Sequence, residues 1–549
     1  MSQRPISTVV ALLCCTALTS AIAVIGARTT ASSLRGTAAS AAGFPFQEAT
    51  LADLQARMRA GEIDSRQLTR AYLDRIAAID AAGPTLRAVI ELNPDAMRDA
   101  AALDAERRAG KLRGPLHGIP VLLKDNIDAV PMANSAGSLA LAGNHPKTDA
   151  PLVARLRAAG AVILGKTNLS EWANFRSTHS ISGWSGRGGQ TRNPYALDRS
   201  PCGSSAGSGA AIAANLAAVG VGTETDGSIL CPSAVNGLVG IKPTVGLVSR
   251  TGIIPISSSQ DTAGPMARTV ADAATLLAAM AAPDPRDPRD PATRDAAQHR
   301  ADYIAALTPG ALKGARIGVL RDKTGYLPAL DAAFEQAIAA LRKAGAEVVD
   351  VEIPTAGQWD DAETEVLLYE FKDGLNRYLA DSHAPVASLA DLIAYNAAHA
   401  DAEMPWFAQE LFDMAQAKGP LTDRAYLEAR AKARRLAKDE GLDAALKAQR
   451  LDALVAPTTS PAWTIDAVNG DHFTGAGYGI AAVAGTPSIT VPMGDVHGLP
   501  VGIAFMGAAW SEAKLIGYAF AFEQATHARR PPTFAPSIDM TAPRRRDGR

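Results

Sequence analysis

Apolar residues recur at helical spacing soon after the first forty residues of the chain. Segments 51–58 and 67–79 carry apolar side chains three or four positions apart, and Leu68, Tyr72 and Ile76 share one face of the second segment. This spacing buries one stripe of a helix and leaves the opposite side to water. We therefore expect two amphipathic helices here.

Short runs of β-branched and aliphatic residues lie between the helical segments. Residues 151–159 have the pattern of a helix that ends at Gly160, and residues 161–164 follow as a strand. Residues 208–218 are small, apolar and free of proline, which predicts a buried helix. Further elements are expected as strands at 316–320, 347–351, 451–455, 488–491 and 501–505, and as helices at 330–344 and across most of 361–449. Alternation of helices and strands predicts an α/β layered architecture.

The two ends of the chain differ from this pattern. Arg4 precedes an uncharged apolar run over residues 8–27, and Arg28 with small polar residues follows. A basic start before an apolar run predicts a signal peptide at 1–27. Because the run is about long enough to span a bilayer, an uncleaved N-terminal anchor is the alternative. Both readings imply export to the periplasm or the medium.

These boundaries divide the chain into four parts. They are the leader or anchor at 1–27, a disordered linker at 28–43, one folded domain at 44–537 and a disordered tail at 538–549. Within the domain, repeated Asp-Pro-Arg units at 283–295 predict a surface loop or linker.

Composition narrows the classes of partner. The 549 residues carry a formal net charge of −2, and 47% are hydrophobic. This hydrophobic fraction is sufficient for a large core, and the charge gives no electrostatic reason to expect nucleic acid. We expect no nucleic-acid partner, no membrane contact beyond an N-terminal anchor, and a monomer.

Residues 160–167, Gly-Ala-Val-Ile-Leu-Gly-Lys-Thr, match the P-loop pattern. A P-loop needs a strand, then a Gly-rich turn that faces phosphate, then a helix. Here a helical segment comes first, and the four intervening residues are apolar and strand-like. The match therefore predicts a buried strand and not a nucleotide site.

One lysine and two serines stand in distinctive frames. Lys124 follows the apolar run Val-Leu-Leu and precedes Asp-Asn-Ile-Asp; Ser204 lies in Ser-Pro-Cys-Gly-Ser-Ser-Ala-Gly-Ser; Ser228 lies in Gly-Thr-Glu-Thr-Asp-Gly-Ser-Ile-Leu-Cys-Pro. A serine hydroxyl is a weak nucleophile that needs a base. Lysine serves as a base only when it is neutral, and burial favours its neutral form.

These frames together resemble the amidase signature family of serine hydrolases. Other segments that carry the resemblance are 165–174, 188–195, 252–257, 261–265, 368–372, 388–393 and 485–492. The extended set is most similar to the bacterial peptide amidase branch, whose members remove the C-terminal amide of peptides and release ammonia. The resemblance implies one domain around a large mixed sheet covered by helices, with no cofactor and no metal.

Catalytic roles follow from the same resemblance. It implies Ser228 as nucleophile, Ser204 in a cis peptide as proton relay, and Lys124 as base. It also implies an oxyanion hole formed by the backbone N–H groups of Thr225, Asp226, Gly227 and Ser228.

Two positions depart from the common pattern of the family. Asp226 stands where glycine is usual, so its side chain is expected to narrow or polarise the leaving-group region. Leu230 stands where many members carry arginine. Without that cation, a small acidic substrate is disfavoured.

Motif position suggests which side chains line the substrate cleft. The candidates are Trp172, Asn174, Trp184 and Gln260, with Asp226 beside them.

The cysteines of the body are Cys202 and Cys231, next to the two serine motifs that the family brings together. An oxidising compartment allows a disulfide between them. Two buried free thiols are the alternative, which we favour.

Other functions remain open at this level. Gly203-Ser-Ser-Ala-Gly207 fits the nucleophile elbow of α/β-hydrolases, with Ser205 as nucleophile, but no strand pattern precedes it. Within the resembling family, a broader aliphatic, aryl or fatty acid amide hydrolase is possible. A different class would be the ammonia-releasing component of a tRNA-dependent amidotransferase, which the export segment disfavours, or a non-catalytic exported binding protein.

Overall fold

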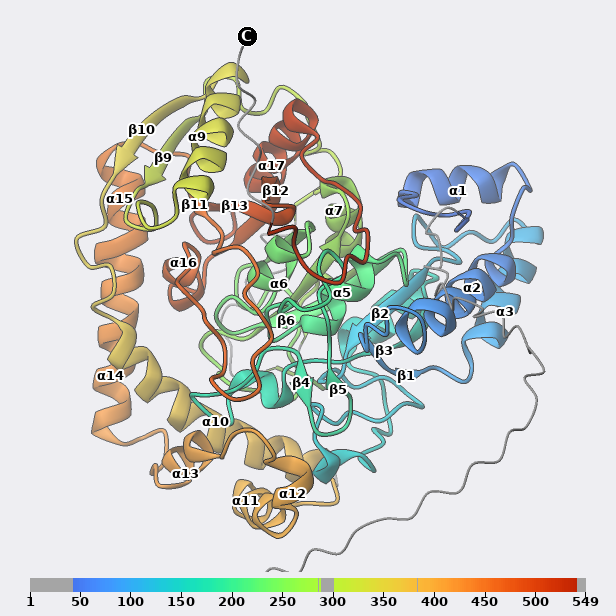
Figure 1. Cartoon of the computed structure of the whole chain (residues 1–549), viewed down its shortest axis with the longest axis horizontal. Helices are drawn as coiled ribbons and strands as arrows, with labels where there is room; N and C mark the ends of the chain where they lie inside the picture. The colour runs from blue at the N-terminus through green and yellow to red at the C-terminus, as the bar shows by residue number, and fades with distance from the viewer. Residues whose placement is uncertain (1–42, 285, 288–300, 383, 541–549) are drawn as a thin grey trace, which may run out of the picture. The chain divides into compact units, whose positions relative to one another are not determined.

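The computed structural model describes residues 43–284, 286–287, 301–382 and 384–540 (Figure 1). The expected leader at 1–27 lies outside these residues, as do nearly all of the linker at 28–43, most of the loop at 283–295 and the tail from 541 onward. In the described part of the chain, no helix is long and apolar enough to cross a membrane.

Eleven strands form one mixed sheet through the domain. Their order across the sheet is β1-β3-β2-β6-β8-β7-β12-β13-β11-β9-β10. The strands are β1 (Val89–Leu92), β2 (Pro120–Lys124), β3 (Val162–Thr167), β6 (Val219–Glu224), β7 (Val239–Lys242), β8 (Thr262–Ala267), β9 (Arg316–Leu320), β10 (Glu347–Val351), β11 (Ala453–Pro457), β12 (Ser488–Val496) and β13 (Leu499–Met506). A separate hairpin pairs β4 (Trp184–Ser185) with β5 (Gly189–Gln190).

The sheet has two parallel ends and an antiparallel centre. At one end β3, β2 and β6 run parallel, with β1 antiparallel at the edge. From β6 to β11 every neighbouring pair is antiparallel, and β11, β9 and β10 are parallel again. Parallel strands need crossover connections, and these supply helices that cover the sheet. The expected large domain with a mixed sheet flanked by helices is confirmed.

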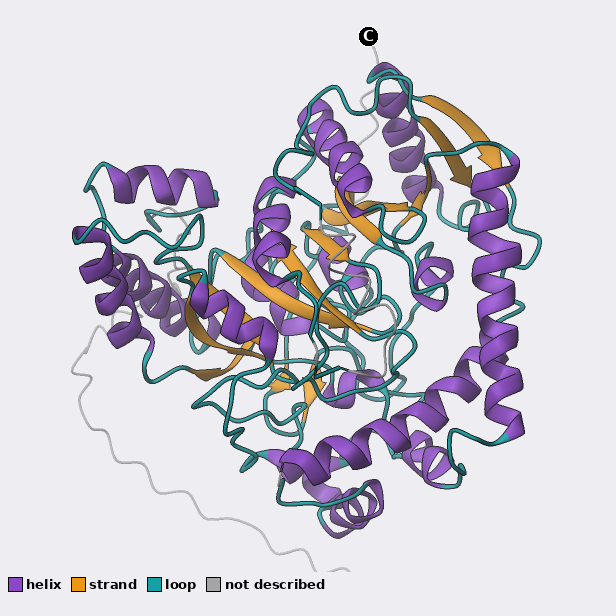
Figure 2. Ribbon diagram, turned by 180° about the vertical axis from the view of Figure 1, so that it is seen from behind, coloured by secondary structure: helices purple, strands orange, loops and turns teal. Residues whose placement is uncertain are grey.

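Helices lie on both faces of this sheet and beyond its ends (Figures 1 and 2). They are α1 (Leu51–Arg59), α2 (Ser65–Arg75), α3 (Ala96–Arg108), α4 (Pro151–Ala158), α5 (Ala206–Ala213), α6 (Leu230–Val235), α7 (Val270–Met280), α9 (Pro328–Lys343), α10 (Asp360–Ser382), α11 (Leu389–Ala398), α12 (Ala400–Glu403), α13 (Glu410–Gln416), α14 (Arg424–Arg434), α15 (Asp443–Ala448), α16 (Gly479–Val483) and α17 (Glu512–Thr526). π-Helical turns at Ile76–Asp80 and Arg435–Leu442 extend α2 and join α14 to α15, and 3₁₀ turns lie at Leu139–Leu141 and Glu171–Asn174.

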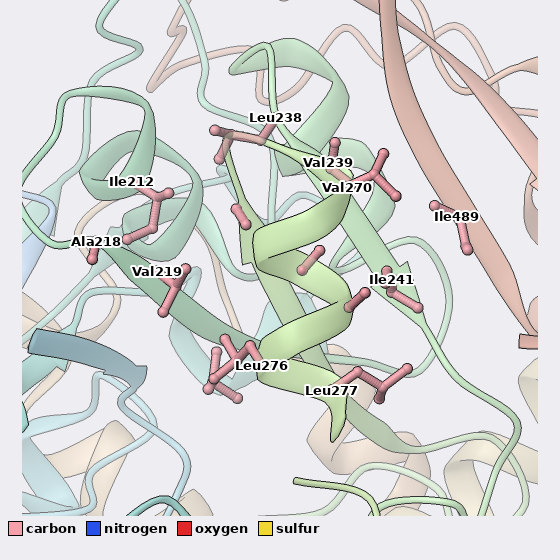
Figure 3. Close-up of a cluster of buried hydrophobic side chains, with 14 of the residues drawn as sticks. Ile212, Ala218, Val219, Leu238, Val239, Ile241, Val270, Leu276, Leu277 and Ile489 are labelled. Carbon is pink, nitrogen blue, oxygen red and sulfur yellow. The ribbon is translucent and has the colours of Figure 1, made fainter. Parts of the chain in front are cut away.

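Helix α7 illustrates how the sheet is covered (Figure 3). It packs on β6, β7 and β8, and its Val270 and Leu277 are fully buried, as are Val219 of β6 and Ile241 of β7. Burial of each such side chain contributes about 1.5–3 kcal/mol. This packing fixes β6, the strand that leads into the turn before Ser228.

Most predicted elements are confirmed, with shifts at their ends. β9 and β10 coincide with the strands expected at 316–320 and 347–351. The buried helix expected at 208–218 instead spans Ala206–Ala213, and the chain then turns into β6. The turn contains Asn215, whose φ of +59° is left-handed, and its side-chain oxygen accepts the Glu48 amide at 2.8 Å. A run of small apolar residues does not encode that stop, because it depends on a distant contact.

The structure corrects our preference for two free thiols, because Cys202 and Cys231 form a disulfide. Cys202 lies in the loop before Ser204, and Cys231 lies in α6, just after Ser228. Their Cα atoms are 6.0 Å apart, within the range that a disulfide spans. Sequence spacing could not show this proximity, since it arises only when the two serine segments pack together.

Loss of this disulfide should destabilise the domain. The bond closes a loop with a sequence separation of 29, and cross-links of this length contribute about 2–4 kcal/mol, chiefly by restricting the unfolded chain. The double variant Cys202→Ser, Cys231→Ser should therefore unfold at a lower denaturant concentration in a circular dichroism titration. Reduced wild-type protein is the matched control, and identical midpoints for oxidised, reduced and double-variant protein would contradict the prediction.

Candidate active site

Lys124 is the last residue of β2 and is completely buried. β2 has a parallel neighbour on each side, β3 and β6, so Lys124 lies at the carboxyl edge of parallel strands, where α/β proteins form their sites. Its Nζ lies 2.7 Å from Ser204 Oγ and 2.9 Å from Thr223 Oγ1, and it donates to the Thr223 carbonyl at 3.2 Å.

Burial sets the charge of this amine. Removal from water lowers the pKa of Lys124 to about 7, and the negative charges of Asp261 and Glu224 oppose the shift only in part. A large fraction of Lys124 is therefore neutral near pH 7, and its lone pair can accept a proton from a hydroxyl.

Ser204 follows Gly203 through a cis peptide bond, as the family resemblance implies. Its carbonyl accepts the Ser170 amide at 3.0 Å, and its hydroxyl lies against the Lys124 amine. Gly203 fits here because a Cβ atom would lie only 2.2 Å from Ser170 Oγ. Ser204 itself is fully buried.

Ser228 ends a turn that joins β6 to α6. The Glu224 side chain accepts the amides of Ile229 at 2.7 Å and Leu230 at 3.0 Å, which caps the start of α6 and holds the turn closed. The Ser205 amide donates to the Ser228 carbonyl at 3.1 Å, so the two serine segments lie side by side. Ser228 is 8% exposed and borders a cavity that we call the main cavity because it reaches this serine.

Gly227 allows this turn to exist. Its φ is +77°, and a Cβ atom would lie 2.2 Å from the ring of Tyr478. Any other residue would be strained twice, by its backbone conformation and by this close approach. The Tyr478 ring therefore packs directly against the turn.

The loop at 256–261 holds Thr225. Asp261 accepts the Thr225 hydroxyl at 2.6 Å, and the Gln260 amide donates to the Thr225 carbonyl at 3.4 Å. Glu370 of α10 holds this loop in turn, because it accepts from the Ser257 hydroxyl at 2.5 Å and from the Ser259 hydroxyl at 2.6 Å. These contacts fix the position of the turn relative to helix α10.

Asp226 is exposed to the cavity, yet protein walls surround its carboxyl. The resulting desolvation, with the charges of Glu363 and Glu224, raises the pKa of Asp226 well above its ordinary value, while Lys242 opposes the rise. The side chain in place of glycine thus adds a polar, protonatable group beside Ser228.

The main cavity has a volume of about 460 Å³. Its wall includes polar and aromatic side chains from three loops, among them Asn174, Ser177, Thr225, Ser228, Trp463 and Phe473. The Asp471 carboxyl accepts a hydrogen bond from the Trp463 indole N–H at 2.9 Å, which holds the loop that carries Trp463 and Phe473 in place. Among the described residues, no group of three or more His, Cys, Asp or Glu side chains is arranged to hold a metal ion.

The expected cleft residues divide into two sets. Asn174 borders the cavity, whereas Trp172, Trp184 and Gln260 are buried and do not line it. The two tryptophans pack on Phe412 and Phe407 of the neighbouring helical region, and Gln260 holds the turn from behind. Their position differs from the expectation because motif position indicates proximity to the site but not the direction of the side chain.

Sequence reasoning missed several residues that shape the site. Tyr478 packs on the Gly227 turn, and Glu363 and Glu370 connect α10 to the loop at 256–261. Glu370 lies in the segment 368–372 that contributed to the resemblance. The motif thus indicated that Glu370 matters for the site, but it did not show which residues Glu370 contacts.

Both rival motifs are explained by structural contacts. The lysine of the P-loop match, Lys166, lies on β3 and is buried, with Nζ 3.2 Å from Asp125 and donating to the Ile127 carbonyl. Ser205, the serine of the elbow match, is fully buried and donates to the Thr223 carbonyl at 3.1 Å. The P-loop segment is therefore a core strand, as expected.

Comparison with known proteins identifies the family. A family model described as Amidase matches residues 67–516 of the chain. The chain belongs to the amidase family. The native peptide amidase of Stenotrophomonas maltophilia superposes with a TM-score of 0.86 at 63% sequence identity, over 90% of this chain and all of that one. The protein is an amide-hydrolysing enzyme with the amidase signature fold.

More distant relatives show the breadth of the family. A protein of Arabidopsis thaliana named probable amidase is 42% identical over 89% of this chain and 92% of its own length. A glutamyl-tRNA(Gln) amidotransferase component of a Synechococcus strain is 36% identical over 87% of this chain and 92% of its own length. Amidase family membership alone therefore does not fix the substrate.

Substitution of Gly227 should distort the turn. In Gly227→Ala the added methyl would contact the Tyr478 ring and the residue would keep an unfavourable positive φ, which should cost on the order of 1–3 kcal/mol. We expect a lower midpoint of thermal unfolding and a large loss of amide hydrolysis. Tyr478→Ala removes the contact but not the backbone strain, so Gly227→Ala should cost less stability in a Tyr478→Ala background than in wild type, as a double-mutant cycle measures. Unchanged stability of Gly227→Ala would contradict this account of the turn.

Proposed function

We propose that this amidase hydrolyses the C-terminal amide of peptides to the free acid and ammonia. The observation that carries the proposal is the buried Lys124 amine, 2.7 Å from Ser204, beside the Ser228 segment at the wall of a 460 Å³ cavity. The 63% identity to an enzyme named peptide amidase supports this substrate class. The reaction needs no cofactor and no metal in this scheme.

Acylation starts with attack of Ser228 Oγ on the amide carbonyl carbon. The Ser228 proton passes to Ser204 Oγ as the Ser204 proton passes to the neutral Lys124 amine. The carbonyl oxygen becomes an oxyanion in the tetrahedral intermediate. When the C–N bond breaks, the nitrogen takes up the proton that returns through Ser204, and ammonia leaves an ester on Ser228.

Water completes the cycle along the same path. It attacks the ester carbon while Ser204 and Lys124 accept its proton, and the second tetrahedral intermediate releases the peptide acid as Ser228 regains its proton. No external acid or base is required, because the proton shared by the three side chains returns to its starting point.

Backbone amides of the Ser228 turn supply the oxyanion hole in this proposal. Thr225, Asp226, Gly227 and Ser228 are the donors that the family resemblance implies. The Gly227 amide also contributes a hydrogen bond to the Glu224 carboxyl, so we assign the larger share to the other three amides. Fixed donors of this kind lower the barrier, since removal of one costs about 10²–10³-fold in rate.

We further propose that residues 1–27 direct export and that 44–537 act as a monomeric amidase domain. Arg4 ahead of the uncharged apolar run supports export. Export would separate the enzyme from aminoacyl-tRNA, which disfavours a role in an amidotransferase complex despite the Synechococcus relative. A broader preference for aryl or fatty amides is the alternative that a substrate panel must exclude.

Purified protein alone should release ammonia from a dipeptide amide, in a one-to-one ratio with free dipeptide. Ser228→Ala should abolish this release, while the matched variant Ser205→Ala should keep turnover. Among the described residues the Ser205 hydroxyl bonds to the Thr223 backbone, and its removal leaves the bond from the Ser205 amide to Ser228 in place. Mass spectrometry of the products and an ammonia assay measure both quantities. Faster hydrolysis of aryl or long-chain amides, or no hydrolysis without a partner protein, would refute the proposed substrate class.

The dependence of kcat/KM on pH tests the role of Lys124. The base must be neutral, and its pKa is lowered to about 7, so kcat/KM should be low at pH 5, rise through a midpoint near pH 7 and level off in alkali. Lys124→Ala should lower kcat by about 10³-fold or more. A flat profile between pH 5 and 9, or near-normal turnover of Lys124→Ala, would show that another group is the base.

A further inference from the structure

A second cavity adjoins the main one at the Ser228 turn. It has a volume of about 370 Å³, comparable with the 460 Å³ of the main cavity. The two share Asp226, Phe473 and Tyr478 in their walls, so they meet within two residues of Ser228. A Cβ atom on Gly479 would lie 3.7 Å from Asp226 Oδ2, which places that carboxyl against the wall of the second cavity.

Carboxyl groups dominate the polar part of this side pocket. Asp226, Asp322, Asp360 and Glu363 line it. Glu363 is 9% exposed, and one of its oxygens accepts the Gln260 amide at 2.7 Å. Burial raises the pKa of Glu363 to about 7, and Asp360 adds to the rise. The fold thus keeps acidic groups together at an energetic cost that a bound cation would relieve.

In the described part of the chain, nearby cations do little to neutralise these acids. Lys323 stands at the wall of the side pocket, but its Nζ pairs with the exposed Asp322 at 3.2 Å. Lys242 lies on β7 in the core, where its Nζ donates to the Pro243 carbonyl, and it offsets the shift of Asp226 only in part.

Aromatic and aliphatic residues form the remaining walls of the side pocket. Trp359 and Tyr478 are buried, Phe473 is half exposed, and Leu320 and Ile480 complete the apolar surface. Aromatic faces attract alkylammonium and guanidinium groups through their quadrupoles. The side pocket therefore combines aromatic faces, apolar area and carboxylates, as a site for an organic cation requires.

Tyr478 places a polar group at the junction of the two cavities. The residue is 7% exposed and borders both cavities. Among the described residues, its hydroxyl has no hydrogen-bond partner. The hydroxyl oxygen is not among the fully buried polar atoms, so it is open to the junction of the cavities, where it can donate to or accept from a ligand group.

We propose that this side pocket binds the alkylammonium or guanidinium end of a basic residue that carries the terminal amide of the substrate. The proposal rests on the proposed peptide amidase function and adds a side-chain preference to it. The reacting carbonyl would lie at Ser228, and the side chain of the same residue would pass Asp226 and Tyr478 to reach Glu363. An apolar terminal residue would lack a partner for these carboxylates.

Paired substrates isolate the contribution of the charge. Acetyl-alanyl-lysine amide and acetyl-alanyl-norleucine amide differ at the terminal residue essentially by one ammonium group. We expect wild-type enzyme to favour the lysine amide by about tenfold or more in kcat/KM, which corresponds to about 1.4 kcal/mol. In Glu363→Gln this ratio should fall toward one, and the substituted side chain can still accept from Gln260. Because the ratio compares two substrates on one variant, a general loss of activity cancels.

Control variants locate the effect. Glu352→Gln makes the same change from carboxyl to amide at an exposed residue outside the side pocket, and its ratio should match wild type. Asp360→Asn should lower the ratio less than Glu363→Gln, since Asp360 is exposed, and it serves as the second test if Glu363→Gln does not fold. A ratio near one for wild type, or the same ratio in wild type and Glu363→Gln, would overturn the proposal.

Direct binding separates this proposal from the proposed function. Titration calorimetry with n-butylammonium should show binding to wild type that is weakened about tenfold or more in Glu363→Gln. The neutral n-pentanol should bind both proteins more weakly than n-butylammonium binds wild type. This measurement needs no turnover. Ammonium binding without hydrolysis of any peptide amide would refute the proposed function and support the cation site. Hydrolysis of peptide amides without a difference between lysine and norleucine would support the function and refute the cation site.

Discussion

The contact between the buried Lys124 amine and the Ser204 hydroxyl is the constraint on which the rest of the site depends. A charged ammonium at the buried carboxyl end of β2 would be unfavourable, so burial lowers the pKa of Lys124 to about 7. The parallel strands on each side of β2 exclude water from this position. The large hydrophobic core thus has a chemical consequence, because it keeps an amine available as a proton acceptor near neutral pH.

The turn before Ser228 is held from three directions, and each contact has a separate origin. Glu224 caps the start of α6 behind the turn, Asp261 and Gln260 hold Thr225, and the Tyr478 ring covers Gly227. The Cys202–Cys231 disulfide joins the two serine segments. Preorganised backbone donors need such support, because a donor that can move loses much of its advantage in the transition state.

Specificity in this family depends on side chains that surround a common framework. Relatives named as amidases, as a peptide amidase and as a component of glutamyl-tRNA(Gln) amidotransferase share most of the length of this chain. The acidic side pocket next to Asp226 is a local feature of the kind that distinguishes substrates, since it changes the electrostatics beside the reacting carbonyl without altering the sheet. Fold and reaction class therefore follow from the framework, and substrate preference follows from the cavity walls.

The sequence by itself determined the α/β class, many helices and strands, and the three frames around Lys124, Ser204 and Ser228, because local periodicity and short motifs encode these features. It did not determine that Cys202 and Cys231 pair, that Trp172 and Trp184 point into the helical region, or that Tyr478 covers Gly227. Each of these depends on contacts between segments far apart in the chain. Only the tertiary structure decides them, since side-chain direction and distant proximity result from the packing of the sheet against its helices.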